Sequence, residues 1–486
     1  MGVSLNPASI LSGQGFDVSS VVQQIITEQS GPLSVWENQQ ATLQSQSIAL
    51  TAINNDLGHL ASAVQALSDP VGVFVTQAAN SSEPGVLTAT AQSTATAGSH
   101  QIIVNSLATT GALYTEGIPH PNASILGGAL SGDIQLQVGG ASGTTHDINI
   151  TPGSNDTLNT LASYINTQST ANSWGVTASV VTDATGSRLA LYSQATGSTG
   201  ALALSSTVLP NNTTTLTFDA AVGGANASFS IDGVPFSSTS NTVTGAIPGV
   251  TLNLLSPAPG NPVQLTVGID QGQITAAINN FVSAYNTVIN DINQQYTVNP
   301  VSNVEGPLGA DTSLRTLQSS LLQDAAFALP LDSNSGYVNL ESLGINTNND
   351  GTLTVGLNAA GASLNDVVAS NPAAVQSFFQ NSSSTGFANT FNADLTNLLD
   401  PTNGVLNVDL AQNKTSIQNL TDNITNFQTQ LTAEQAQLTS QYSAVNASLE
   451  SYPLLLQSIT EVLGSLGGSS SSSGTTSTNP ILTSGL

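Results

Sequence analysis

The stretch from Val408 to Tyr452 constrains the fold most, because neither glycine nor proline interrupts it. One apolar position in it recurs every seven residues, at Leu410, Ile417, Ile424, Leu431, Leu438, Val445 and Tyr452. A strict seven-residue apolar repeat keeps one stripe of a helix facing a partner, as in a coiled coil. At 1.5 Å per residue this helix would be roughly 65 Å long. It cannot be buried on all sides, so it needs a partner stripe.

A second apolar repeat lies near the other end of the chain. It consists of Trp36, Leu43, Leu50, Leu57 and Val64, again at intervals of seven. Matched repeats at opposite ends predict that the terminal segments pair and that everything between them is inserted. The alternative is two ordinary amphipathic helices that pack on separate cores. Both stripes include polar positions, so the paired segment should be only moderately stable.

The charge composition excludes several classes of function. Charged residues make up 7% of the 486 residues, the formal net charge is -26, and the only cations among Lys and Arg are Arg188, Arg315 and Lys414. Binding to nucleic acid or to an anionic membrane surface needs clustered cations, so neither is expected. There is no cysteine for a disulfide or thiol site. Neither a basic leader with an apolar run nor eighteen consecutive apolar residues occurs, so we expect no cleavable secretory signal and no membrane insertion.

Local patterns place helices and strands along the chain. Helical spacing follows a predicted cap at Asp17, returns after a predicted cap at Asn155, and recurs over 273–289, 311–328 and, partly, 363–379. Strand patterns cover about 86–90, 101–104, 134–138, 176–181, 189–192 and parts of 214–269. Tight turns are predicted at Ala97–Ser99, Asp183–Gly186, Asp232–Gly233 and Asn349–Gly351. After Tyr452 we expect Pro453 to follow the long helix, with a short apolar stretch beyond it.

These elements predict a discontinuous, multidomain α+β fold. Its N- and C-terminal helices pair in a coiled-coil leg, and β-rich domains are inserted between them. The expected parts are a disordered or short-helical N-terminal region over 1–34, the leg over 35–72 and 273–453, a β-rich domain over 73–130 and 226–272, an inserted α+β outer domain over 131–225, and a C-terminal region with a flexible Ser-rich tail over 454–486.

Two blocks of short motifs resemble the flagellar hook-associated protein 2 family, the bacterial filament cap proteins. The first block has Gly15, Phe16, Asp17 and Val18, then Pro32 and Leu33, Leu67 to Pro70, Phe74, Leu87 to Ala91, and Gly98, Ser99, Val104, Leu107 and Ala108. The later block has Phe281, Val282, Ala284, Tyr285 and Asn286, then Gly306 to Gly309, Asp311, Leu314, Arg315, Leu343 to Ile345 and Asp350 to Leu353. Phe229 to Leu255 is similar to the β motif of hook and flagellin-related proteins. Pro453 and the Ser-rich tail depart from the family pattern, and 110–226 resembles it loosely.

The resemblance implies an assembly role. Such proteins form a homo-oligomeric ring, usually of five subunits, at the distal tip of the flagellar filament, where it retains exported flagellin and promotes its polymerisation. Partners implied with it are hook–filament junction proteins and a flagellar export chaperone. The family leaves the cell through the flagellar type III channel, which would account for the missing cleavable signal. The two heptad stripes, from Trp36 to Val64 and from Leu410 to Tyr452, are the candidate coiled-coil and assembly interface.

No residue pattern indicates catalysis. His59, His100, His120 and His146 lack metal-ligand spacing. Asn346, Asn348, Asp350 and Gly351 imitate the start of a calcium loop, but Leu357 stands where a bidentate glutamate is needed. We therefore expect no catalytic, cofactor-binding or metal-binding residues. A secreted surface adhesin built on β modules is the alternative function, and an extracellular enzyme is a more distant one.

Overall fold

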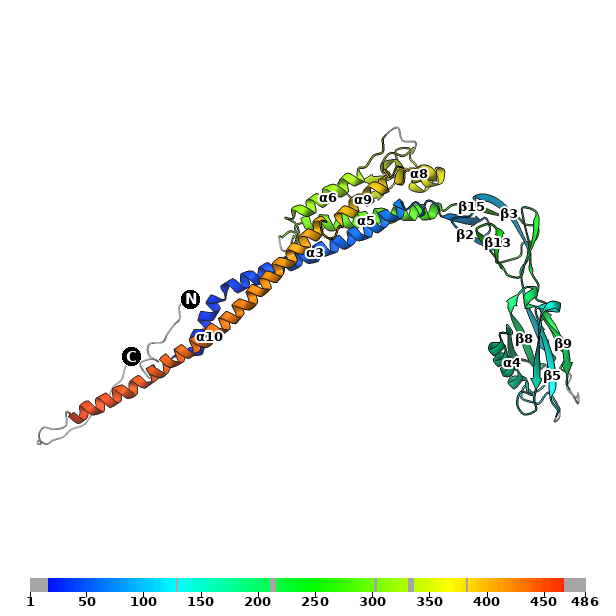
Figure 1. Cartoon of the computed structure of the whole chain (residues 1–486), viewed down its shortest axis with the longest axis horizontal. Helices are drawn as coiled ribbons and strands as arrows, with labels where there is room; N and C mark the ends of the chain where they lie inside the picture. The colour runs from blue at the N-terminus through cyan, green and yellow to red at the C-terminus, as the bar shows by residue number, and fades with distance from the viewer. Residues whose placement is uncertain are drawn as a thin grey trace, which may run out of the picture.

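The chain forms an elongated, bent molecule with a helical leg at one end and two β lobes at the other (Figure 1). The computed structural model describes residues 16–127, 130–209, 216–300, 304–330, 336–381 and 383–466. A helical bundle lies between the leg and the lobes. The predicted α+β architecture is confirmed, because segments near both ends of the chain lie side by side in the leg and every strand of the described residues falls between them.

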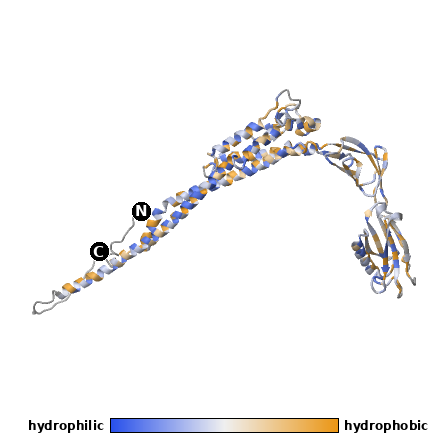
Figure 2. Cartoon of the chain, viewed as in Figure 1, coloured by the Kyte–Doolittle hydropathy of each residue, from blue (hydrophilic) through white to orange (hydrophobic). Residues whose placement is uncertain are grey.

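Three helices build the leg: α2 (Val18–Gln29), α3 (Gly31–Ser68) and α10 (Val405–Leu466). Asp17 caps α2, since its side chain accepts a hydrogen bond from the Ser20 N–H. Only Ser30 separates α2 from α3, and Pro32 lies in the first turn of α3, where a missing N–H costs nothing. Hydrophobic residues are spread along the whole leg (Figure 2).

The long helix continues beyond the end that the sequence predicted. Pro453 lies inside α10, and the helix ends only at Leu466. A proline removes one backbone donor and crowds the preceding turn, so it favours a helix end. Here the leucine-rich segment on the C-terminal side of Pro453 has high helix propensity, so the helix continues through it. At 62 residues, α10 is about 93 Å long.

The bundle packs the second half of α3 against five shorter helices and a small hairpin. These are α5 (Gln271–Tyr296), α6 (Thr312–Ala325), α7 (Leu364–Ser370), α8 (Pro372–Phe379) and α9 (Phe387–Leu398), with η3 (Glu341–Leu343), β16 (Ile345–Thr347) and β17 (Leu353–Val355). Phe387 lies at the centre of its core, within 6 Å of five other phenylalanine rings. The helix α9 was not predicted, although Phe387, Phe391 and Leu395 recur every four residues and are buried on one face of it.

The inner β lobe continues directly from the bundle. One sheet has the order β1-β15-β3-β11-β12 and a second has β13-β14-β2. The strands are β1 (Gln77–Ser81), β2 (Leu87–Ala91), β3 (Gly98–Ser106), β11 (Ala227–Ile231), β12 (Val234–Ser238), β13 (Thr242–Ile247), β14 (Val250–Leu254) and β15 (Val263–Ile269). Asp232 and Gly233 form the predicted hairpin turn with φ values of 51° and 82°. The turn predicted at Ala97–Ser99 is wrong in part, since β3 already begins at Gly98.

The outer lobe has two antiparallel sheets and one helix. Its sheets are β10-β4-β8-β7 and β6-β5-β9. The elements are β4 (Thr110–Thr115), β5 (Gly132–Val138), η1 (Gly140–Ser142), β6 (Thr144–Ile150), α4 (Leu158–Asn172), β7 (Val176–Asp183), β8 (Gly186–Thr196), η2 (Ser198–Gly200), β9 (Leu202–Val208) and β10 (Phe218–Val222). The cap of α4 is Thr157 rather than Asn155, whose amide instead joins Thr151 to Asn149.

One predicted boundary between the lobes is wrong. The strand β4 falls within the expected β-rich segment 73–130, but it pairs with β8 and β10 of the outer lobe. Ile118 and Ile125 are buried in the same outer core. The reason is that the chain crosses between lobes at Thr109, whose N–H donates to Ala225 at 2.9 Å. The division lies near residue 109, and the rest of the domain division remains a proposal.

The junction between the lobes is closely packed. Thr196 donates a hydrogen bond across it to the Thr239 carbonyl at 2.6 Å, and the Ser198 N–H donates to Asn226 at 2.6 Å. A β-carbon at Gly197 would overlap the Cα and carbonyl oxygen of Thr239. Backbone therefore approaches backbone at a distance that only glycine allows.

Candidate assembly surface

The leg is an antiparallel helix pair with a constant register. Trp36 packs edge-on against Phe427 with ring centroids 5.4 Å apart. Gln40 donates to Thr421 at 2.7 Å, and Gln29 donates to Glu434 at 2.8 Å. The two residue numbers of each pair add up to between 461 and 463. The N- and C-terminal segments thus run side by side over several helical turns.

The register continues to the beginning of the described chain. The Phe16 N–H donates to the Asn446 side chain at 2.7 Å, and the Phe16 ring packs edge-on against Tyr442 at 6.0 Å. This pairing brings together residues 430 positions apart in the sequence. Hydrogen bonds between amide, hydroxyl and carboxylate groups alternate with aromatic contacts along the seam.

The structure divides the N-terminal stripe between two environments. Trp36 and Leu43 are half-buried in the two-helix part of the leg. Leu50, Leu57 and Val64 are fully buried, but in the bundle core, together with residues of α5 and α9. The second half of α3 therefore packs mainly in the bundle, and the seven-residue repeat alone did not reveal this change of partner.

The C-terminal stripe of α10 also changes along its length. Leu410 packs against the bundle core, while Ile417, Ile424 and Leu438 are half-buried in the leg. Leu431 is 8% exposed and is the most buried of the seven. Val445 and Tyr452 are 50% and 62% exposed. The contacts of this single chain therefore cover the stripe as far as Leu438 and leave its last two members open.

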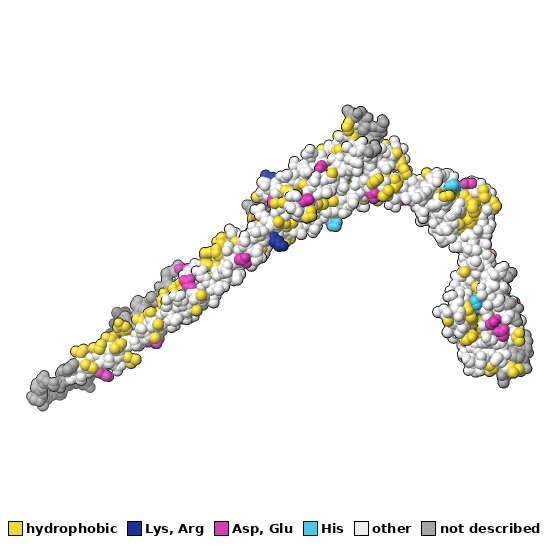
Figure 3. All heavy atoms as spheres, in the orientation of Figure 1, with side chains coloured by type: hydrophobic (Ala, Val, Ile, Leu, Met, Phe, Trp, Pro, Cys, Tyr) yellow, Lys and Arg dark blue, Asp and Glu magenta, His cyan; other side chains and the backbone are white. Residues whose placement is uncertain are grey.

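A larger apolar face follows Tyr452, and sequence reasoning missed its helical form. Tyr452, Leu456, Ile459 and Leu463 are separated by three or four residues, so they lie on one face of α10. Leu455 and Val462 extend the same face, and all six are more than half exposed. Hydrophobic side chains gather at this end of the leg in Figure 3. An exposed apolar face of this kind marks an interaction site in a soluble protein.

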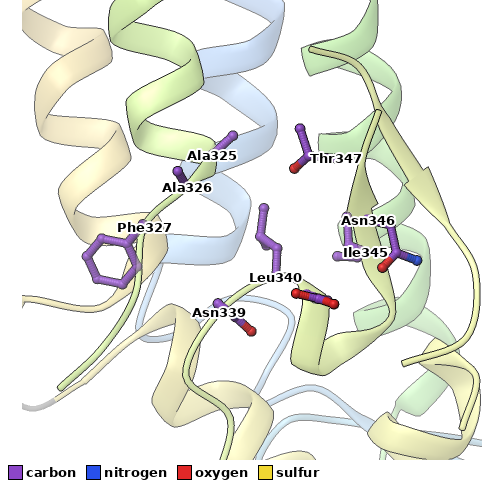
Figure 4. Close-up of a pocket in the computed structure, with 9 residues that line it drawn as sticks. Ala325, Ala326, Phe327, Asn339, Leu340, Ile345, Asn346 and Thr347 are labelled. Carbon is purple, nitrogen blue, oxygen red and sulfur yellow. The ribbon is translucent and has the colours of Figure 1, made fainter. Parts of the chain in front are cut away.

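A pocket in the helical bundle lacks the features of an active site. The pocket in Figure 4 has a volume of about 320 Å³ and lies at the C-terminal end of α6. Its polar lining consists of Asn339, Glu341, Asn346 and Thr347, of which Glu341 has the one ionisable side chain. A general acid–base pair or an activated nucleophile needs a second titratable group within reach. None of the residues that line this pocket supplies one.

The histidines and the calcium-like loop have local structural roles. His100 Nδ1 lies 2.8 Å from Asp232, whose other oxygen accepts from the Gln101 N–H, so the contact braces the β11–β12 turn. His146 stacks on Trp174 at 4.8 Å. Asp350 accepts from the Thr352 N–H and hydroxyl, which holds its pKa below the usual value and closes the β16–β17 turn. Over the described ranges, no three His, Asp or Glu side chains gather as metal ligands would.

Comparison with known proteins identifies the family. The models of the N- and C-terminal parts of flagellar hook-associated protein 2 match residues 14–111 and 224–452. The B-type flagellar hook-associated protein 2 of Pseudomonas aeruginosa is 33% identical over 352 residues, which are 65% of this chain and 70% of that protein. The chain belongs to the flagellar hook-associated protein 2 family. The N-terminal match runs from α2 to the start of β4, and the C-terminal match ends at Tyr452, the first residue of the exposed face of α10.

Other members of the hook-associated protein 2 family extend the comparison. The Escherichia coli protein is 26% identical over 413 residues, which cover 81% of this chain and 85% of that one. The crystal structure of the D1-D2-D3 domains of the flagellar cap protein from Escherichia coli has a TM-score of 0.51 and 25% identity, and it covers 75% of this chain and 99% of that one. The flagellin hook IN motif matches residues 133–195, in the outer lobe. Our placement of this motif at Phe229–Leu255 was therefore wrong.

No helix in the described parts of the chain combines the length and apolarity of a membrane span. The family is one of structural flagellar components. Its members include a solved flagellar cap protein that shares this fold.

Proposed function

We propose that this chain caps the flagellar filament. Copies of it assemble at the distal tip, retain exported flagellin beneath them and promote its polymerisation. Membership of the hook-associated protein 2 family and the shared fold of a flagellar cap protein support this function. The adhesin alternative has no comparable support.

One structural observation carries the proposal furthest: the apolar face at the free end of the leg. A two-helix leg that ended its own packing near Asn446 would need no further apolar surface. Instead α10 continues for 20 residues past Asn446, and Leu455, Leu456, Ile459 and Leu463 remain exposed on it. Burying such a face against other subunits stabilises an assembly by about 25 cal/mol per Å² of apolar area. The leg is therefore the part that contacts neighbours, and the lobes lie at the opposite end.

The composition of the assembly is part of the same proposal. The partners are other copies of this chain, in a ring of five, together with flagellin, the hook–filament junction proteins and an export chaperone. We also propose export by the flagellar type III route without a cleaved signal. Of the predicted interface residues, Val445 and Tyr452 are the two whose exposure leaves them free for contacts between subunits. The other ten serve mainly the fold of one chain.

Deletion of the gene tests the function. The deletion strain should secrete flagellin as unpolymerised monomer, carry short or absent filaments and lose motility. Complementation with the full chain should restore all three properties. A chain with Val445→Asp and Tyr452→Asp should fold but fail to complement, because both side chains are exposed. Gln457→Asp adds one negative charge on the polar side of the helix and should complement. Normal filaments in the deletion strain would contradict the proposed function.

A further inference from the structure

The bundle contains carboxyl groups that have no cationic partner. Over the described residues the ion pairs are His100–Asp232 and Arg188–Asp183, and both lie in the β lobes. Of the two cations among the helices, Arg315 lies 5.7 Å from the Tyr296 ring centroid. A buried carboxylate without a cation or sufficient donors is costly, so the group retains its proton instead.

One pair of facing carboxyls connects α6 with α9. The side chains of Asp324 and Asp394 face each other, and the Oδ2 atom of Asp324 is buried with no group that donates a hydrogen bond to it. The third titratable group here is Tyr285 on α5, whose hydroxyl donates to the Leu321 carbonyl at 3.4 Å. Burial and the facing Asp394 raise the pKa of Asp324 to about 8.

A second pair connects α3 with α5 in the same bundle. Asp56 hydrogen-bonds Asp291 through their side chains. Burial and the facing Asp291 raise the pKa of Asp56, while His59, one turn along α3, acts in the opposite direction. Two carboxyls in hydrogen-bond contact must share a proton, since two negative charges at this distance repel each other. The two contacts together therefore join four of the helices around a single core.

We propose that these two carboxyl pairs make the helical bundle a pH-responsive unit, in which a shared proton joins the helices and its removal loosens them. The ligand is a proton, and the responding contacts are α6–α9 and α3–α5. The β lobes have no such pairs among their described residues, so the response is confined to the bundle.

The direction of the effect follows from proton linkage. Asp324 binds its proton more tightly in the folded chain than in the unfolded one, where its pKa is near 3.8. Its contribution to stability is therefore fully present below that value and is lost as the pH rises toward 8. One proton changes the folding equilibrium constant by at most about tenfold per pH unit. Because both pairs are only half-buried, we expect about two- to threefold per unit.

Hydrogen exchange of the full chain tests this inference, since it resolves individual helices. Between pH 5.5 and 7.5, the protection factors of amides in α6 and α9, corrected for intrinsic exchange, should fall by about four- to tenfold. Asp324→Asn should remove most of this fall, because an amide donates to the facing carboxylate at every pH. Asp56→Asn should act in the same direction on the amides of α3 and α5. Asp422→Asn on the exposed side of α10 removes one charge elsewhere and should leave the dependence unchanged.

Two results would overturn the proposal. One is equal protection of α6 and α9 at both pH values in the unsubstituted chain. The other is a loss of protection between the two pH values that is as large in the Asp324→Asn variant as in the unsubstituted chain. If Asp324→Asn does not fold, Asp394→Asn tests the same contact from the facing helix, with the same expected result. Amides of β2 and β14 serve as an internal reference, because their core contains no carboxyl pair.

Discussion

Leu431 offers the sharpest test of the paired leg. It is 8% exposed, and it lies one turn beyond Phe427, whose ring contacts Trp36. Replacing Leu431 with Asp removes a buried apolar side chain and places an unpaired charge in the seam. Such a change costs roughly 3 kcal/mol if the site cannot relax, and a two-helix seam relaxes more easily than a core, so about 2–3 kcal/mol is expected. Adding Leu438→Asp, at a half-buried position, should cost about 1 kcal/mol more.

Trp36 reports the leg directly. The chain has two tryptophans, and Trp174 belongs to the outer lobe. In a Trp174→Phe background, urea unfolding followed by fluorescence therefore measures the leg alone. With a slope of about 1 kcal/mol per M for so small a unit, Leu431→Asp should lower the midpoint by about 2 M or abolish the transition.

A matched control keeps the charge and moves it to solvent. Thr432 is exposed on the next position of α10, so Thr432→Asp should shift the midpoint by less than about 0.5 M. If Leu431→Asp behaves like Thr432→Asp, then Leu431 is not part of a seam and the reasoning from the register is refuted. Loss of helix by circular dichroism should accompany the real effect, while the β signal of the lobes stays unchanged.

Three further predictions concern the other parts of the molecule. Phe387→Ala should destabilise the bundle by about 3–5 kcal/mol, measured as lost amide protection in α5 and α9, because five rings surround that side chain; β-lobe amides should not change. Gly111→Ala should lower the melting temperature of the lobes, because the added carbon overlaps the Gly200 carbonyl, whereas Gly223→Ala, with open space around it, should not. The Ser124 hydroxyl lowers the pKa of Asp156, so outer-lobe stability, followed by Trp174 fluorescence, should fall as pH drops below about 4; Asp156→Asn should flatten this dependence.

Sequence patterns predicted those elements whose signal is local. The turn at Asp232–Gly233 is where the sequence placed it, since two positive φ values in succession favour this residue pair. The spacing of Ile274, Ile278 and Phe281 predicted α5, and all three are buried on one face. The seven-residue repeats are also a local signal, and they predicted that the two terminal segments pair.

What the sequence could not show is the choice of partner. The repeat from Trp36 to Val64 is uniform, yet its last three members are buried in the bundle, because the competing apolar surfaces come from α5 and α9 far along the chain. The carboxyl pairs form only where two helices that are distant in the sequence pack against each other, as α3 and α5 do at Asp56 and Asp291. For the exposed face of α10, the sequence predicts only a short apolar stretch, because Pro453 indicates a helix end.

The contact between Phe16 and Asn446 also has a consequence for the order in which the chain folds. A contact that spans 430 residues cannot form until nearly the whole polypeptide is present at one place. Each lobe and most of the bundle close over shorter loops, so their contacts form faster. A chain that emerges progressively from a ribosome or a channel would therefore complete its lobes first and its leg last. The surface that we propose for contacts with neighbouring subunits thus becomes available only when the rest of the molecule is finished.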